Sequence, residues 1–341
     1  MAIKNKNIII AGQKIAPGTS ATVSLPAPDL YTQTKIDIPI HIFHGKNAGP
    51  KLFVTSAIHG DELNSIEIIR RLHAQKWIKN IKGTLITIPV VNIYGFLIQS
   101  RYLPDRRDLN RSFPGSKAGS LAARLANLIT EEIISKCQYG IDLHTGALGR
   151  TNLPQLRVSL DTPGTKQLAK AFEAPVIIDA KIREGSLRKA ASELGVPMLV
   201  YEAGEALRFN ELCIRMGVRG IAKVMNYLKM VSVPSLNKKS QYKSVITQTA
   251  RWVRAAVSGF LEPVKDISKS FMVKKGETLA YIHDPFLINA SQRVIAPFDG
   301  ILIGITNLPI VNEGDAIYNI ASTKKLKHVE AYIEELREEL S

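Results

Sequence analysis

An imidazole and two carboxylates, those of His59, Asp61 and Glu62, lie in the segment AIHGDELNS between a predicted strand and a predicted helix. The apolar run at 51–56 indicates a buried strand, and helical spacing of apolar residues from Ile66 predicts a helix. His59 and Glu62 are three residues apart on this turn and can point at one centre, and Zn²⁺ accepts mixed nitrogen and oxygen ligands. The alternative interpretation is a helix-capping acid beside a packed histidine.

A third metal ligand is available in the predicted strand YGIDLHTG, residues 139–146. Asp142 and His144 are two residues apart, so their side chains face the same side of a strand. His144 can bind a metal. Asp142 can instead accept the other ring N–H of a ligand histidine, as outer carboxylates of metal sites do. The alternative is a histidine that is simply hydrogen-bonded at a strand end.

Two more polar clusters follow strands. Residues 100–115, SRYLPDRRDLNRSFPG, hold four arginines and Asn110, and arginine is suited to bind a carboxylate through two hydrogen bonds. Residues 200–205, VYEAGE, end an apolar strand at Glu202, which could act as a general base near the metal. The alternatives are a solvated basic loop and a surface glutamate.

The conjunction of these four motifs, in this order, resembles the succinylglutamate desuccinylase/aspartoacylase family, which belongs to the carboxypeptidase-A-like zinc hydrolases. The resemblance covers roughly residues 45–230, and the β-rich C-terminal part also looks like that of the family. By motif, it implies that His59, Glu62 and His144 bind one zinc ion per chain. It also implies that Glu202 is the catalytic glutamate.

The resemblance implies that the DLNR segment binds the substrate. Asn110 and Arg111 would hold a substrate carboxylate, and an arginine upstream would polarise the carbonyl of the bond to be cleaved. Arg101 fits by its Arg-Tyr context and Arg106 by proximity, because this stretch is about two residues longer than the family form. We rank Arg101 slightly ahead and keep both.

Three further residues after His144 are predicted to contact the substrate and set specificity, although no motif fixes their roles: Arg150, Asn152 and Arg157. The activity that the resemblance implies is zinc-dependent hydrolysis of the amide bond of a small N-acylated amino acid or a related carboxylate-bearing amide. The alternatives are a zinc carboxypeptidase acting on peptides and, less favoured, a non-catalytic binding protein. The size of the pocket discriminates between the first two.

Alternating strand-like and helix-like segments between about 51 and 230 predict an α/β protein. The expected fold is a three-layer α/β/α zinc-carboxypeptidase-like domain with a mixed sheet at 1–235, including lead-in strands at 1–48. A linker is expected at 231–244. Ligand sites in such sheets gather at strand ends, where the polar motifs lie.

Residues 240–322 are expected to form a smaller β-rich domain, because the segments at 273–279 and 311–317 repeat one pattern. This resembles the biotinyl/lipoyl-type barrel-sandwich fold, but no lysine lies between Lys275 and Lys324, which disfavours a carrier role. We expect residues 280–295 to narrow the entrance to the zinc cleft. His283 and Arg293 in that stretch could touch the substrate, although solvated loop residues are the favoured interpretation.

Residues 323–341 predict one helix with an apolar seam, at Leu326, Val329, Ile333, Leu336 and Leu340. Such a seam usually docks on its own chain. Otherwise it pairs with another subunit, which would make the protein a homo-oligomer.

The net charge is +15, and residues 1–235 hold 31 Lys and Arg against 18 Asp and Glu. No nucleic-acid motif accompanies this excess, so a small anionic acylated amino compound is the expected partner, although a basic surface without a role is an equal alternative. No apolar run is long enough to cross a membrane, and we expect no signal peptide because the segment MAIKNKNIIIAGQK lacks an apolar region of adequate length. Cys137 and Cys213 form no metal-type pair, which indicates a cytoplasmic, reduced protein.

Overall fold

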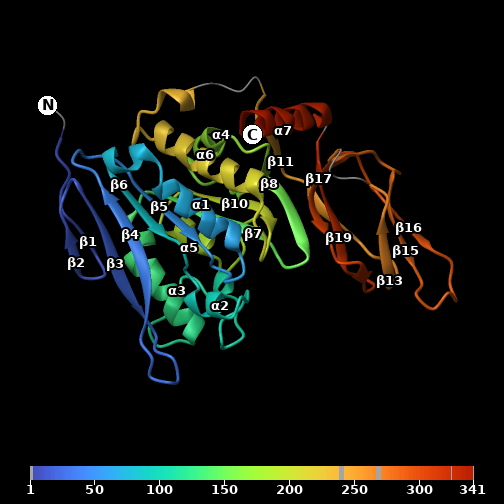
Figure 1. Cartoon of the computed structure of the whole chain (residues 1–341), viewed down its shortest axis with the longest axis horizontal. Coiled ribbons are helices and arrows are strands. Elements are labelled where there is room, and N and C mark those ends of the chain that lie inside the picture. Colours follow the sequence, from blue (N-terminus) through green and yellow to red (C-terminus); the bar gives the residue numbers. More distant parts are fainter. Residues whose placement is uncertain (1–2, 238–241, 266–269, 324, 341) are drawn as a thin grey trace.

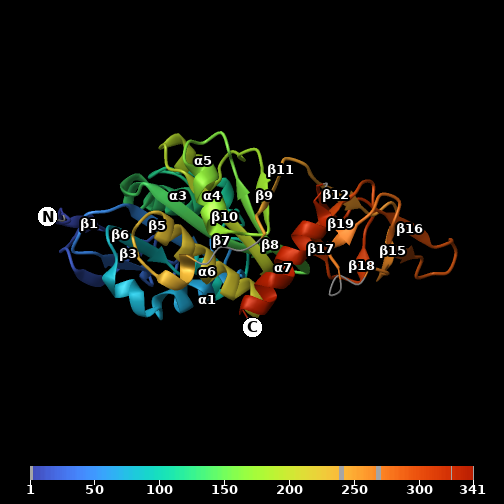
Figure 2. The ribbon, with the colours of Figure 1, turned by 90° about the horizontal axis from the view of Figure 1, so that it is seen from above.

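The computed structural model describes residues 3–237, 242–265, 270–323 and 325–340. Figures 1 and 2 show an elongated molecule in which a large α/β part lies beside a smaller all-β part built from the C-terminal residues. Helix α7 lies along the boundary between them. The expected starting residue of the second domain, residue 240, lies outside the described residues.

The strands include those predicted at 51–56 and 139–146. Their bounds are β1 Ile8–Ile10, β2 Gln13–Ile15, β3 Thr19–Ala27, β4 Ile36–His44, β5 Lys51–Ser56, β6 Thr84–Ile88, β7 Tyr139–Gly146, β8 Arg150–Val158, β9 Val176–Asp179, β10 Met198–Glu205, β11 Val245–Thr247, β12 Ala250–Arg254, β13 Gly259–Pro263, β14 Met272–Val273, β15 Thr278–His283, β16 Gln292–Ile295, β17 Gly300–Thr306, β18 Ile310–Val311 and β19 Ala316–Ser322.

The helices alternate with the strands in the larger part, as predicted. They are α1 Leu63–His73, α2 Ile93–Leu97, α3 Leu121–Glu132, α4 Thr165–Phe172, α5 Leu187–Glu193, α6 Glu211–Tyr227 and α7 Leu326–Leu340, with short 3₁₀ turns at Lys76–Asn80, Leu109–Arg111, Ile134–Lys136 and Pro234–Asn237. Local signals start several of them. Ser120, for example, accepts a hydrogen bond from the backbone N–H of Ala123 at the start of α3.

One mixed sheet runs through both parts of the molecule. Its main path is β12-β19-β17-β8-β10-β7-β5-β6-β4-β3, with β9 and β11 continuing from β8. Strands β5, β6, β7 and β10 run parallel to one another, whereas β8 runs antiparallel to β10 and β4 runs antiparallel to β6. The mixed α/β class predicted from the sequence is therefore confirmed.

The parallel strands are buried on both faces, which is why their sequences are continuously apolar. In β5, Phe53 packs into one hydrophobic core with α3 and α5, whereas Leu52 and Val54 face a second core with α1, α4 and α6. Successive side chains of a strand point to opposite faces, so one short apolar run serves both cores. Helices thus cover both faces of the central sheet.

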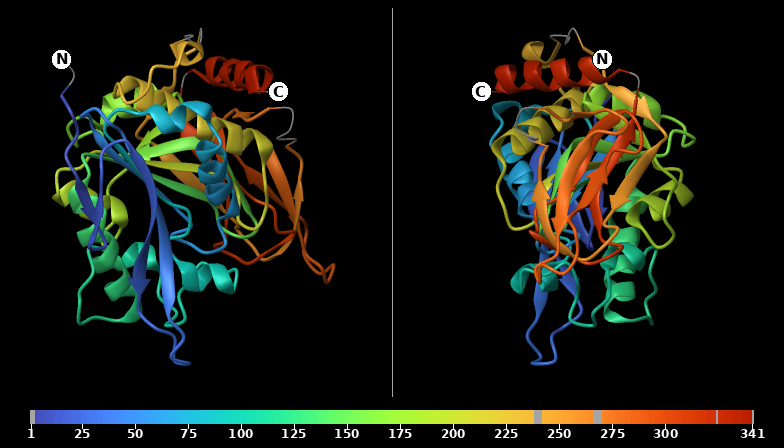
Figure 3. Two further views of the ribbon diagram at one scale, coloured as in Figure 1. Left: turned by 60° about the vertical axis from the view of Figure 1, so that its left-hand side comes forward. Right: turned by 90° about the vertical axis from the view of Figure 1, so that its right-hand side faces the viewer.

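The N-terminal residues form strands, as expected. β3 and β4 pair antiparallel along their full lengths, and β4 joins β6 at the edge of the central sheet. The long β3–β4 hairpin projects from the body of the molecule in Figures 1 and 3.

The C-terminal part consists of strands β12, β14, β17 and β19 facing a four-stranded sheet of order β16-β15-β13-β18. The internal repeat is visible as two equivalent turns. The Lys274 N–H donates to Glu277 Oε2, and the Asn312 N–H donates to Asp315 Oδ2, each at 2.8 Å. The repeated acid therefore caps its own turn in both copies.

Strands that follow the predicted linker pair with strands that precede it, and this pairing joins the two parts. Strand β11, which follows the linker, pairs with β9 of the larger part. Strand β17 pairs antiparallel with β8, so that Gly304 is opposite Asn152 and Thr306 is opposite Arg150. This continuous hydrogen-bonded ladder fixes the smaller part against the larger one.

Helix α7 lies against its own chain (Figure 3), and its predicted seam makes the contact. Leu326, Val329 and Ile333 join a core with β9, β11 and β17, while Leu336 joins the core of α6. Arg219 of α6 forms an ion pair with Glu339 at 3.2 Å. Pairing of two chains through this helix stays a prediction.

Both cysteines are unpaired and buried, and burial raises the pKa of each thiol to about 12. Thiols with such values are poor nucleophiles at neutral pH. Among the described residues, no helix is both long and apolar enough to cross a membrane.

Candidate active site

The polar motifs meet at the carboxyl ends of three adjacent parallel strands, β5, β7 and β10. The turn after β5 carries His59 and Glu62, β7 carries Asp142 and His144, and β10 carries Glu202. Carboxyl ends of neighbouring parallel strands lie on one edge of a sheet, so residues far apart in the sequence converge there.

The turn that carries His59 is held by close backbone packing. The Gly60 N–H donates to the carbonyl oxygen of Ser100 at 3.0 Å. A Cβ at Gly60 would lie 2.0 Å from the backbone carbon of Gly95, so no other residue fits this position without displacing the backbone. Glu62 then starts helix α1, and its side chain makes no capping bond, which leaves the carboxylate available for the histidines.

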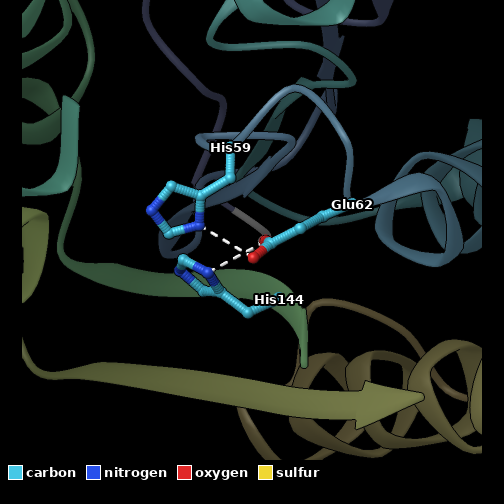
Figure 4. Close-up of side chains that lie close together, drawn as sticks. All are labelled: His59, Glu62 and His144. Carbon is cyan, nitrogen blue, oxygen red and sulfur yellow. Dashed lines mark hydrogen bonds and ion pairs between the residues drawn. The ribbon is translucent and has the colours of Figure 1, made fainter. Parts of the chain in front are cut away.

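His59, Glu62 and His144 form a buried cluster (Figure 4). Nδ1 of His59 lies 2.8 Å from Glu62 Oε1, and Nδ1 of His144 lies 3.0 Å from Glu62 Oε2. Candidate ligand atoms of the three residues all lie within 4.8 Å of one another. The sequence prediction that these three residues converge on one centre is confirmed.

Each histidine uses its second ring nitrogen on an outer carboxylate. His144 Nε2 lies 2.7 Å from Asp142 Oδ2, as predicted, and Thr55 Oγ1 donates to the other oxygen of Asp142 at 2.8 Å. His59 Nε2 lies 3.2 Å from Asp108 Oδ1, a contact that the sequence analysis missed. Such partners fix the ring orientation and leave both Nδ1 atoms facing the centre.

The electrostatics of the cluster follow from burying opposite charges together. For Glu62, burial would raise the pKa, but His59 and His144 lower it to about 2. For His144, burial opposes protonation, yet Asp142 and Glu62 raise its pKa well above the ordinary value. The pKa of His59 is raised in the same way by Glu62 and Asp108.

This arrangement fits a metal ion. Oε2 of Glu62 is fully buried and has no hydrogen-bond partner of suitable geometry among the described residues, although His144 Nδ1 is close to it. Two imidazole nitrogens and a carboxylate oxygen directed at one point are a donor set that Zn²⁺ favours, with a fourth position left for water or substrate. Within the described residues, no other group of three potential ligands is this close.

Of the two candidate upstream arginines, Arg101 lies at the site. Its Nη2 donates to Asp108 Oδ2 at 2.8 Å, and its Nη1 lies 3.3 Å from His59 Nδ1. Arg106 is exposed, has a backbone φ of 62°, and does not line the pocket. The geometry thus favours Arg101 for the carbonyl-polarising role, which itself stays a prediction.

Asn110 and Arg111 both line the pocket. Oδ1 of Asn110 accepts the backbone N–H of Leu187 at 2.9 Å, so this amide also attaches the DLNR turn to the start of α5. Burial lowers the pKa of Arg111, and nearby Arg183 and Arg101 lower it further. An anion bound in the pocket would relieve the repulsion between Arg111 and these two arginines.

Glu202 is opposite His144 in the parallel β10–β7 register, so both side chains emerge on the same face of the sheet. Nδ2 of Asn152 donates to Glu202 Oε2 at 2.7 Å, and Nε of Arg157 lies 3.4 Å from Oε1. The Glu202 side chain remains 20% exposed, and it lines the pocket with His59, Glu62 and His144.

Glu205 has a different environment. Its Oε1 accepts the backbone N–H of Gly149 at 3.0 Å, and its Oε2 accepts Nδ2 of Asn307 at 2.8 Å. It does not line the pocket. Glu205 therefore ties the loop after β7 to the smaller part.

The pocket has a volume of about 400 Å³ and a strongly basic lining. Four of the five arginines predicted as site residues line it, namely Arg101, Arg111, Arg150 and Arg157, whereas Arg106 does not. Three further cations that the sequence analysis did not single out also line it: Lys181, Arg183 and Arg188. Its acidic lining residues are Glu62, Asp142 and Glu202. Burial lowers the pKa of Arg188 to about 10, and Arg157 adds to this effect.

The smaller part reaches the pocket through Trp252 of β12, not through the segment expected to form a lid. The Arg150 guanidinium carbon lies 5.1 Å from the centre of the Trp252 ring. Residues 280–295 do not line the pocket, and the prediction of a lid from this segment is wrong. β15 and β16 lie in the sheet that faces away from the larger part (Figure 1).

His283 and Arg293 bond within the smaller part. His283 contacts Ser291 and Glu262, and Arg293 donates to Thr278. This agrees with the favoured interpretation of both as solvated residues without a role in the site.

A family model described as the succinylglutamate desuccinylase/aspartoacylase catalytic domain matches residues 48–228, more than half of the chain. The chain belongs to this family. N-alpha-acetyl-L-2,4-diaminobutyric acid deacetylase of Halomonas elongata is 25% identical over 305 residues, covering 83% of this chain and 85% of that protein. That relative is a deacylase by its name.

Solved structures of this family share the fold. A succinylglutamate desuccinylase/aspartoacylase from Rhodobacter sphaeroides superposes with a TM-score of 0.80 at 24% identity, covering 89% of this chain and 95% of that one. The product-bound ectoine utilization protein EutE (DoeB) from Ruegeria pomeroyi gives 0.78 at 22% identity, with the same coverage. These likenesses cover both parts of the molecule.

Three kinds of site residue were missed by the sequence analysis, for different reasons. Asp108 stands inside the quoted DLNR motif, so its contact with a ligand histidine could have been proposed from the outer carboxylate that such histidines need. Arg183 and Arg188 belong to KIREGSLRK, a basic stretch that leads from β9 into the first turn of α5. Trp252 carries no sequence signal, because only the β8–β17 pairing brings it near.

Proposed function

We propose that this protein is a zinc-dependent deacylase that cleaves the amide bond of a small, anionic N-acylated amino acid. The observation that carries the proposal is one pocket that contains the His59, Glu62 and His144 cluster, Glu202 and a wall of arginines. Membership of a family named for two deacylases, and a relative named as a deacetylase, support the same activity.

His59, Glu62 and His144 would hold the zinc ion. When bound there, zinc supplies an electrophile that acidifies water toward a pKa of about 7 and polarises a carbonyl oxygen. Glu202 would accept the proton of the attacking water as its oxygen bonds to the acyl carbon. As the C–N bond breaks, Glu202 would return that proton to the amine nitrogen, a role worth on the order of 10²–10⁴ in rate.

The arginines would bind and orient the substrate. Arg101, beside His59, would stabilise negative charge that develops on the acyl oxygen. Asn110 and Arg111 would hold a substrate carboxylate, because guanidinium and amide groups offer several fixed donors. The excess of cations over carboxylates in the lining supports an anionic substrate.

A peptidase built from the same residues is the second candidate. It is less favoured because the pocket is only about 400 Å³ and is bounded by Trp252 from the smaller part. A carrier role for the smaller part, whose repeat resembles barrel-sandwich domains, is disfavoured because no lysine lies between Lys275 and Lys324. A cytoplasmic location stays a prediction from the two unpaired thiols.

The test combines metal analysis with a substrate screen. Purified protein loaded with zinc should contain about one ion per chain and should hydrolyse some members of a panel of acetyl-, succinyl- and formyl-amino acids. Glu202→Gln is the matched control, because it should retain zinc and lose turnover. Hydrolysis of dipeptides alone would favour the peptidase, and zinc-loaded protein inactive on the whole panel would contradict the proposal.

A further inference from the structure

A row of residues crosses the joint between the two parts of the molecule. Asn152 of β8 is opposite Gly304 of β17, Gly304 is opposite Asn319 of β19, and Asn319 is opposite Trp252 of β12. Residues in one such row project from the same face of a sheet. On its other side, Asn152 is opposite Gly204 of β10, two residues after Glu202.

Gly304 leaves the space in which this row packs. A Cβ at this position would lie 3.1 Å from Oδ1 of Asn152, 3.2 Å from Cβ of Asn319 and 3.4 Å from Cη2 of Trp252. A side chain at this position would therefore press on the Asn152 amide and on Asn319, which would have to shift by a few tenths of an ångström. The absent side chain leaves the space over this backbone to the Asn152 amide and the Trp252 indole.

The Asn152 amide makes a hydrogen bond that bears on the reaction. It is 8% exposed, and its Nδ2 donates to Glu202 Oε2 at 2.7 Å. Nε of Arg157 lies 3.4 Å from Oε1 but makes no hydrogen bond of suitable geometry. Among the described residues, Asn152 is thus the hydrogen-bond donor that sets the rotation of the Glu202 carboxylate.

We infer that the smaller part positions the general base: Gly304, backed by Trp252, holds the Asn152 amide against Glu202. This inference rests on the proposed function, and it makes Asn152 a positioning residue where the sequence suggested a substrate contact. An amide that donates to one carboxylate oxygen holds the plane of the carboxylate, and proton transfer requires that alignment. The smaller part would thereby act on turnover without covering the pocket.

The test compares variants of zinc-loaded, full-length protein. Asn152→Ala should lower kcat roughly ten- to hundredfold, the equivalent of a hydrogen bond to a charged group, with little change in KM. Asn152→Asp should be worse than Asn152→Ala, because it places a second carboxylate against Glu202. A role in packing alone predicts the reverse order, since aspartate has the shape of asparagine.

A double-mutant cycle then tests the link to the smaller part. Gly304→Ala should lower kcat in the wild-type background and have little further effect in the Asn152→Ala background. Asn307→Ala is the matched control: it perturbs the same joint, where Asn307 donates to Thr151 and Glu205, without touching Glu202. Equal losses from Gly304→Ala in both backgrounds would overturn the inference.

A crystal structure of Gly304→Ala gives a readout that is independent of activity. The expected result is an Asn152 amide displaced from Glu202, with the zinc ligands unmoved. Retention of the 2.7 Å contact would overturn the inference even if the protein hydrolysed none of the compounds screened. An inactive wild type with a displaced amide in the variant would instead contradict the proposed function alone.

Discussion

Acidic residues have different roles in the larger and the smaller part of the molecule. In the larger part, Glu62 is buried at the end of a parallel strand between two histidines, with a pKa of about 2. In the smaller part, Glu277 and Asp315 cap two equivalent turns by accepting backbone N–H groups. Strand ends that meet inside a mixed sheet therefore concentrate unsatisfied polar groups, whereas local turns satisfy theirs within a few residues.

The histidines show the same contrast. His59 and His144 are 3% and 5% exposed, and each directs one ring nitrogen toward the carboxylate of Glu62. His283 is also paired with a carboxylate, Glu262, but it lies at the surface of the smaller part. Burial and convergence, rather than the presence of a histidine–acid pair, mark the functional site.

The largest effect should come from the metal ligands. His59→Ala/His144→Ala is expected to abolish zinc binding and activity, because one remaining carboxylate cannot hold a catalytic zinc ion. Elemental analysis of the purified protein measures the loss. His283→Ala, the matched control from the smaller part, should retain one zinc per chain. Full occupancy in the double variant would contradict the assigned ligands.

Glu202→Gln should rank next, with kcat lowered by roughly 10²-fold or more and zinc retained. Glu205→Gln should change kcat far less, because Glu205 bonds to Gly149 and Asn307 outside the pocket. It should instead lower the melting temperature. Steady-state kinetics and thermal unfolding separate the two effects. A larger loss of kcat in Glu205→Gln would mean that the wrong glutamate carries the proton.

Protons should compete with zinc at the cluster. The pKa values of His59 and His144 are raised in the metal-free protein, which favours protonation of both imidazoles in competition with zinc. Zinc affinity should rise with pH, by up to about tenfold per pH unit for each proton released. Calorimetry in buffers of different ionisation enthalpy counts these protons, and a titration that releases none would contradict this account.

The same shifts predict the stability of the metal-free protein. Because the folded-state pKa values of both histidines are raised, their contribution is fully present below their unfolded value of about 6.5. It is lost as the pH rises through the folded values. Glu62, with a folded value of about 2, contributes above its unfolded value of about 4.3 and loses this contribution as the pH falls toward 2. Thermal unfolding measured from pH 3 to 9 should therefore show the highest stability between the loss at low pH and the loss at high pH.

Trp252→Ala should have a smaller effect on substrate binding, in addition to a loss of kcat through the Asn152 amide. Loss of the ring beneath Arg150 frees this guanidinium, and such contacts are worth about 0.5–1 kcal/mol at exposed sites. We expect KM to rise roughly two- to fivefold. Trp77→Ala, in the larger part outside the pocket, is the control. An unchanged KM in Trp252→Ala would remove the direct role of the smaller part in substrate binding.

The smallest effect should come from the tip of the β15–β16 hairpin. Phe286, Leu287 and Ile288 are 80%, 91% and 81% exposed there, and none lines the pocket. Replacing all three by serine should leave kcat and KM unchanged, as measured with the substrate found in the screen. A change in the preference for longer substrates would restore the lid that the structure contradicts.

Much of the site could be predicted because its signals are local. His59 and Glu62 share one turn, Asp142 and His144 share one strand face, and each motif stands where an apolar run ends. The alternation of strands and helices then requires these ends to meet at one edge of a sheet. The identity of the upstream arginine remained ambiguous, because the fold of the loop decides whether Arg101 or Arg106 lies beside His59.

The sequence by itself determined the mixed α/β class, since alternating strand and helix patterns encode it locally, and the motifs that carry the family resemblance located the cluster of His59, Glu62 and His144 and the glutamate near it. Only the tertiary structure decided that Trp252 and not residues 280–295 faces the pocket, and that Asn152 contacts Glu202. The physical reason is that β8 pairs with β17 on one side and with β10 on the other, which joins residues about 150 and 50 positions apart. Their register depends on the packing of both parts together, which no local pattern specifies.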